Sequence, residues 1–140
     1  MSNISMTTSK RNAIVTVMLI SAFVSMLNQT ILNTALPAII KGLNITETTA
    51  QWLITGFMLV NGIMIPLTAF LMDKYSTRHL YIFSMAIFLI GSVVAAVSPT
   101  FSILMISRII QAIGAGILLP LMQFTVFTLF PAEQRGFAMG

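Results

Sequence analysis

Cysteine is absent from the 140-residue sequence, and charged residues make up only 7% of it. Without cysteine, the chain can form neither disulfides nor thiolate metal sites. A soluble domain normally carries about a quarter charged residues, so this chain has too few to solvate a globular surface. Hydrophobic residues reach 57% and the mean hydropathy is +0.98, which indicates an integral membrane protein.

Acidic residues and histidine are also rare. The only acids are Glu47, Asp73 and Glu133, and His79 is the single histidine. We therefore expect no metal site and no bound cofactor. The sequence shows no Ser/His/Asp set, no glycine-rich phosphate loop and no paired carboxylates, so it is not expected to be an enzyme. The net charge of +4 comes from scattered Lys and Arg residues, which does not favour nucleic-acid binding.

Four apolar stretches are long enough to cross a hydrocarbon core, which takes about 20 residues each. They cover about residues 13–35, 49–72, 79–97 and 101–127, and they predict an all-α membrane protein. The predicted separators are Pro37 with Gly42, the charged segment 73–79, and the turn 98–100, in which Thr100 or Ser98 caps the fourth helix. Residues 131–140 are predicted to form a loop and the start of a fifth helix.

The basic residues are unevenly placed about these spans. Alternating spans put five of them on one side, namely Lys10, Arg11, Lys74, Arg78 and Arg135, and only Lys41 on the other. The positive-inside rule then predicts a multi-pass protein of the cell membrane with its N-terminus in the cytoplasm.

Arg108 lies inside the fourth apolar stretch, where a charge costs roughly 2.5–3.5 kcal/mol on insertion scales. At 1.5 Å per residue it lies about 10 Å below the outer surface, and Asn28 of the first span lies at about the same depth. Gln111 follows one turn below Arg108. We expect a polar cluster of Arg108, Gln111 and Asn28 on a substrate or coupling path; the alternative is a structural arginine paired with backbone.

The first span carries a polar face. Its polar residues fall within an arc of about 140°, and they are Ser21, Ser25, Asn28, Gln29 and Asn33. Such a face serves either helix adhesion or a transport path. Because Arg108 is expected to face it, the second reading is favoured, with Ser25 and Asn33 as further path residues.

No carboxylate lies within any predicted span, and arginine keeps its proton. A proton-coupled carrier needs a titratable group in the membrane, so these residues do not hold a complete proton relay.

Small residues in the fourth span predict close helix packing. Ala112, Gly114 and Gly116 would let a neighbouring helix approach closely. Pro66 in the second span and Pro120 in the fourth are expected to kink their helices.

Three motifs, in order along the chain, resemble those of the major facilitator superfamily. AFLMDKYSTRHL (69–80) resembles its signature G-x-L-a-D-R-x-G-x-R-R, with matches at Leu71, Asp73, Lys74 and Arg78 and with Ala69 and Ser76 at two glycine positions. RIIQAIGAG (108–116) resembles its helix-four motif R-x-x-Q-G-x-G-A. LNQTILNTALPAI (27–39) resembles L-D-x-T-I-V-N-x-A-L-P of the fourteen-span drug:proton antiporters, with Asn28 in place of the aspartate.

The resemblance implies a multidrug efflux carrier that exports amphiphilic, often cationic, compounds by proton exchange. It places Asp73, Lys74 and Arg78 in a cytoplasmic gating loop and Arg108 on the coupling and substrate path. With Asn28 at the aspartate position, either another carboxylate takes the proton or the coupling differs. The implied partners are lipid, protons, a small-molecule substrate and the remaining transmembrane helices.

Such carriers are built from two repeated halves, so four spans indicate an N-terminal fragment that is inactive alone. Two alternatives remain. One is a four-span small multidrug transporter acting as a dimer, which relies on an intramembrane glutamate that this sequence lacks. The other is a non-transporting membrane sensor or assembly protein.

Overall fold

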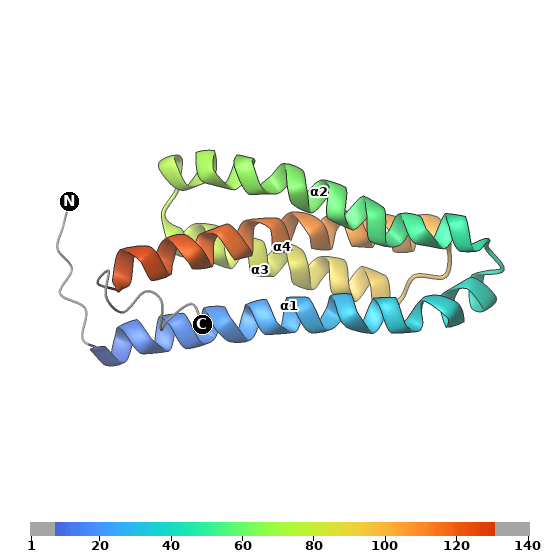
Figure 1. The fold of residues 1–140 in the computed structure, drawn as a ribbon, viewed down its shortest axis with the longest axis horizontal. Coiled ribbons are helices and arrows are strands. Elements are labelled where there is room, and N and C mark those ends of the chain that lie inside the picture. The colour runs from blue at the N-terminus through green and yellow to red at the C-terminus, as the bar shows by residue number, and fades with distance from the viewer. Residues whose placement is uncertain (1–7, 131–140) are drawn as a thin grey trace.

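Four long helices make up the part of the chain that the structure describes. The structure is a computed structural model, and it describes residues 8–130. The helices are α1 (Thr8–Leu43), α2 (Glu47–Lys74), α3 (Thr77–Ala96) and α4 (Phe101–Leu129). All four are long and apolar enough to cross a membrane, and they run alongside one another with alternating direction (Figure 1). The all-α membrane fold is thereby confirmed. The predicted start of a fifth helix lies outside the described residues.

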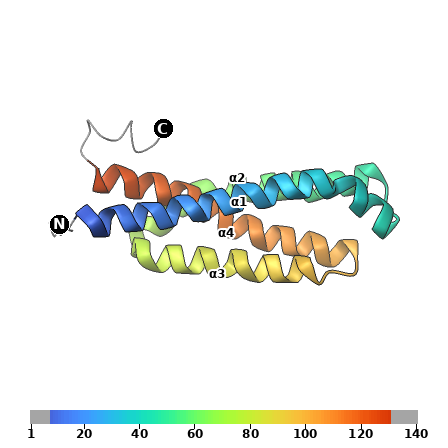
Figure 2. The same cartoon turned by 90° about the horizontal axis from the view of Figure 1, so that it is seen from below.

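The first helix is longer than the predicted span. Pro37 and Gly42 were expected to break the chain, and this expectation is wrong, because α1 continues through both. The helix instead ends at Leu43, and the next residue, Asn44, has a left-handed φ of 51°. The Ile45 amide then donates to the Ile40 carbonyl at 3.2 Å, which is the bond that closes a helix before a left-handed residue. The last part of α1 is deflected from the rest of the helix (Figures 1 and 2).

Threonine side chains begin two of the other helices. Thr46 precedes α2 and accepts a hydrogen bond from the Thr49 amide at 3.2 Å. Thr100 precedes α4 and accepts from the Ile103 amide at 3.4 Å. Each satisfies an amide that has no partner inside the first turn. Thr100, rather than Ser98, is therefore the cap of the fourth helix.

The fourth helix forms the centre of the bundle. Within the most apolar 18-residue stretch of α4, 56% of the residues are buried. The corresponding share in the other three helices is 22–28%. Glycine permits this packing, as the sequence predicted. A Cβ atom at Gly114 would lie 2.6 Å from the Ser84 carbonyl of α3, and one at Gly116 would lie 2.5 Å from Met64 Cβ of α2. Ala112 is fully buried nearby.

The prolines of the second and fourth helices lie inside continuous helices. Pro120 has no N–H, so it offers no donor to the carbonyl of Gly116 four residues earlier. The Thr68 hydroxyl of α2 lies 3.3 Å from this carbonyl oxygen of Gly116. It also lies 2.6 Å from the carbonyl oxygen of Met64, one turn earlier in α2. A neighbouring helix therefore supplies the polar contact that the proline removes.

Candidate functional site

Arg108 is the most deeply buried charge among the described residues, with 2% of its surface exposed. Its Nη1 donates to Asn28 Oδ1 at 3.1 Å and to Gln111 Oε1 at 2.7 Å. Its Nη2 donates to Gln29 Oε1. The structure therefore brings together the three residues of the predicted cluster, and it adds Gln29 from the polar face of α1.

The cluster extends to the two remaining helices. Gln111 Nε2 donates to Ser92 Oγ of α3 at 3.0 Å, and Ser92 donates to the Phe88 carbonyl at 2.9 Å. The Arg108 guanidinium carbon lies 4.3 Å from the centre of the Phe57 ring of α2, within the range of a cation–π contact. All four helices thus contribute to the surroundings of one charge.

The sequence did not predict Ser92 or Phe57 as part of the site. A serine and a phenylalanine in apolar spans are ordinary, and only the rotation of the helices about their axes turns Ser92 toward Gln111 and Phe57 toward Arg108. The neighbouring Gly91 explains in the structure why Ser92 reaches Gln111. A Cβ at Gly91 would lie 2.9 Å from the Gln111 backbone nitrogen, so α3 approaches α4 at this level.

All hydrogen-bond acceptors around the guanidinium are neutral amide oxygens. The described acids, Glu47 and Asp73, are exposed at the ends of α2. No ion pair joins any residues within the range 8–130. Arg108 Nε is buried and has no hydrogen-bond partner there. The cluster therefore carries an uncompensated positive charge within this part of the chain.

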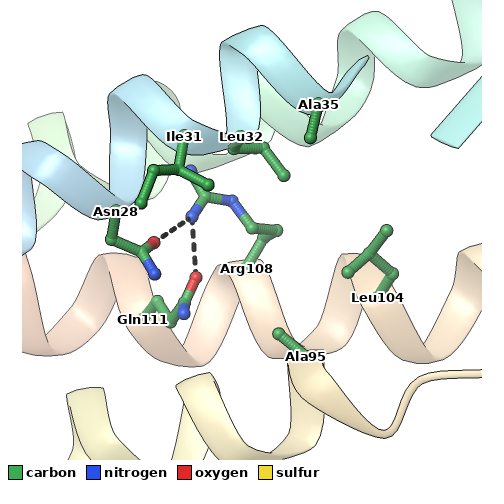
Figure 3. A pocket seen from close by; sticks show the side chains of 8 residues that line it. All are labelled: Asn28, Ile31, Leu32, Ala35, Ala95, Leu104, Arg108 and Gln111. Carbon is green, nitrogen blue, oxygen red and sulfur yellow. Dashed lines mark hydrogen bonds between the residues drawn. The ribbon is translucent and has the colours of Figure 1, made fainter. Parts of the chain in front are cut away.

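A cavity of about 120 Å³ adjoins the cluster between α1, α3 and α4. The side chains that line it are Asn28, Ile31, Leu32, Ala35, Ala95, Leu104, Arg108 and Gln111 (Figure 3). The polar groups lie at one end of this group, and apolar side chains of α1, α3 and α4 form the remainder. The cavity therefore combines one charged wall with apolar walls.

Ser25 and Asn33, the other predicted path residues, do not hydrogen-bond Arg108 in the described structure. Ser25 is half-buried, and Asn33 is exposed. Asn33 follows Asn28 by five residues, which rotates it by about 140° around α1 and moves it about 7.5 Å along the axis. This rotation takes it away from the face that meets α4.

The predicted cytoplasmic gating loop is exposed. Asp73, Lys74 and Arg78 are all exposed, and no ion pair links them within residues 8–130. Lys74 Nζ lies 4.6 Å from the centre of the Phe70 ring. Arg78 contributes to a second, larger cavity of about 900 Å³ between the ends of α1, α3 and α4.

A separate polar contact joins α1 to α3, where the hydroxyl groups of Ser21 and Tyr81 hydrogen-bond at 2.5 Å.

The chain resembles known membrane transporters. The family model of the Major Facilitator Superfamily matches residues 18–140. The uncharacterized MFS-type transporter YcnB of Bacillus subtilis is 55% identical over 130 residues, which are 93% of this chain and 28% of that protein. The lincomycin resistance protein LmrB of Bacillus subtilis is 44% identical over 123 residues, 88% of this chain and 26% of that protein.

A more distant relative is the multidrug export protein EmrB of Haemophilus influenzae. It is 32% identical over 120 residues, 86% of this chain and 24% of that protein. No solved structure shows a significant match to the chain.

The four apolar helices define a multi-pass membrane protein, and the relatives it matches are named as transporters or resistance and export proteins. The chain belongs to the Major Facilitator Superfamily. It spans about a quarter of the length of the relatives it matches.

Proposed function

We propose that the chain is the N-terminal part of a longer carrier that exports small amphiphilic compounds in exchange for protons across the cell membrane. Two relatives are named for lincomycin resistance and for multidrug export, which supports this class of substrate. In this proposal the N-terminus and the loop with Asp73, Lys74 and Arg78 face the cytoplasm, and the loop takes part in gating.

The observation that carries the proposal is the buried Arg108 beside a cavity. Charges inside a membrane are expensive, and where they occur they typically mark a substrate or ion path. Here Asn28 and Gln111 hold the guanidinium at the cavity wall, at 3.1 Å and 2.7 Å. The cavity is small, and in the whole carrier it would open into a larger path at the interface with further helices.

The exposed apolar surface supports the presence of those further helices. Large side chains of α1 such as Ile20, Phe23 and Leu27 are 58%, 64% and 45% exposed. Lipid or other transmembrane helices can cover such a surface. We propose that helices of the remaining carrier cover the side of α1 next to the cavity and supply the proton-accepting group, since no Asp, Glu or His lies within the membrane part of residues 8–130.

Substitution of Arg108 in the whole carrier tests this function. Arg108→Ala is expected to lower export of a dye or antibiotic at least about tenfold, which corresponds to a loss of about 1.4 kcal/mol. Arg108→Lys keeps the charge but has only three donors on one atom, so we expect partial export. Export is measured in cells with the amount of carrier in the membrane determined in parallel.

Lys41→Ala is the matched control, because Lys41 is an exposed basic residue near the C-terminus of α1. It should export like the unmodified carrier. Full export by Arg108→Ala at equal membrane abundance would refute the role proposed for the arginine.

A further inference from the structure

Arg108 has unused hydrogen-bonding capacity. A guanidinium has five N–H groups, and three hydrogen bonds hold this one. Nε has no partner among the described residues, and it is buried. One N–H on Nη2 also remains after the bond to Gln29. A bidentate contact with a carboxylate would use both N–H groups, and it requires the side chains that enclose Nε to move aside.

The acceptors that hold Arg108 are weaker than a carboxylate would be. A carboxylate can accept two parallel hydrogen bonds from a guanidinium and adds an attraction between opposite charges that a neutral amide oxygen lacks. Asn28 and Gln111 line the cavity together with Arg108, so a carboxylate that enters it meets the charge and these amides at once. Their amide NH₂ groups can donate to it as well.

The apolar walls of the cavity favour a ligand whose part beyond the carboxylate is apolar. Ile31, Leu32, Ala35 and Leu104 present apolar side chains to the cavity (Figure 3). A volume of about 120 Å³ is several times what a single water needs. A polar wall opposite apolar walls fits a compound with an acid group at one end and an apolar body at the other.

We propose that this cavity binds a small organic carboxylate, with the acid on Arg108 and the apolar body against α1 and α4. This inference rests on the proposed function, in which the cavity lies on the substrate path. It adds that the bound compound is negatively charged. A cationic compound is disfavoured at the site, because it would face the positive charge of Arg108, which no acid among residues 8–130 compensates.

Ligand binding, rather than export, tests the inference. Benzoate, benzamide and benzamidine have the same apolar ring and carry a negative, a neutral and a positive group. We expect benzoate alone to bind the whole carrier in lipid nanodiscs, with a rise of about 1–3 °C in its unfolding temperature near saturation. Ionic strength is held constant, and calorimetry measures the dissociation constant.

Asn28→Asp places a carboxylate where an amide oxygen now meets Arg108 at 3.1 Å. This internal acid should weaken benzoate binding at least about tenfold. Gln29→Glu should weaken benzoate binding in the same way, and it replaces Asn28→Asp as the test variant if Asn28→Asp does not fold. Gln51→Glu makes the same kind of change at an exposed position of α2 and should bind benzoate normally.

Three results would overturn the inference. Equal binding of benzamide would show that the charge is not recognised. Unchanged benzoate binding by Asn28→Asp and Gln29→Glu would place the ligand elsewhere. A lack of benzoate binding together with destabilisation by Asn28→Asp would show that an acid from another helix already pairs with Arg108. Export without benzoate binding would leave the proposed function standing, and benzoate binding without export would remove only that function.

Discussion

At the scale of single residues, Gln111 connects the arginine to the rest of the bundle. It is 1% exposed, accepts from Arg108 Nη1 at 2.7 Å and donates to Ser92 Oγ at 3.0 Å. The Gln111 side chain thereby uses both the oxygen and the NH₂ group of its amide. As a result, α3 and α4 are linked by a hydrogen bond as well as by packing. In lipid such contacts have no competing water, and the groups they hold have few alternative partners.

Replacement of Gln111 by leucine should therefore destabilise the carrier. Gln111→Leu has similar bulk but leaves an Arg108 N–H without its acceptor, while the Ser92 hydroxyl loses only the Gln111 donor and keeps its bond to the Phe88 carbonyl. An unsatisfied buried group costs about 1–3 kcal/mol, and more when it is charged. Unfolding of the purified carrier in denaturant measures the loss.

Gln123→Leu is the control for this substitution. Gln123 lies on the same helix but is exposed, so its replacement should change stability little. If both variants unfolded at the same denaturant concentration, the polar link through Gln111 would contribute no stability.

At the scale of helices, glycine residues of α4 allow the neighbouring helices to pack closely against it. Gly114 faces α3, where an added Cβ would meet the Ser84 carbonyl at 2.6 Å and the Phe88 nitrogen at 2.9 Å. Backbone atoms cannot rotate away as a side chain can, so the helices themselves would have to separate. Gly62 of α2 has no neighbour within 4 Å of the same position.

Gly114→Ala and Gly62→Ala therefore differ in their expected effects. The first should destabilise by about 1–3 kcal/mol through overpacking. The second should be neutral or stabilise by up to about 1 kcal/mol, because alanine favours helix more than glycine does. The unfolding temperature of each carrier variant distinguishes the two, and an equal shift in both would show that α3 and α4 are not in close contact at Gly114.

Hydropathy was enough to predict four apolar helices, and depth with polar periodicity predicted that Arg108, Gln111 and Asn28 lie together. Arg108 and Asn28 were placed at the same depth by counting from the outer ends of their apolar stretches, and they do hydrogen-bond, although α1 continues beyond its stretch to Leu43. The outer end of α1 was misplaced, since a proline removes one backbone hydrogen bond without ending a helix, whereas Asn44 changes the chain direction. Ser92 and Phe57 depend on how α3 and α2 are rotated, which is set by packing and cannot be read from depth.

At the scale of the whole molecule, the charges gather at the two ends of the bundle unequally. Lys10 and Arg11 begin α1, and Lys74 ends α2 next to Arg78 at the start of α3. Arg11 lies 4.6 Å from the centre of the Phe130 ring, so the start of α1 and the end of α4 also meet at this end. Lys41 lies near the opposite end of α1.

Because basic residues are retained on the cytoplasmic side, this distribution predicts the orientation of the bundle. The absence of cysteine allows a direct test, since single cysteines can be introduced without removing others from this part of the chain. Ser76→Cys lies between α2 and α3, and Ser98→Cys lies between α3 and α4. Any cysteines elsewhere in the whole carrier are replaced first.

In intact cells, a maleimide that does not cross membranes should label Ser98→Cys and leave Ser76→Cys unlabelled. After the membrane is permeabilised, both should react, because both positions lie in connections outside the helices. The reverse pattern in intact cells would place the N-terminus outside. It would also put the loop with Asp73 and Arg78 on the outer face, where it could not form a cytoplasmic gate. Labelling of neither position after permeabilisation would mean that the rest of the carrier covers these connections, against the arrangement proposed for the gating loop.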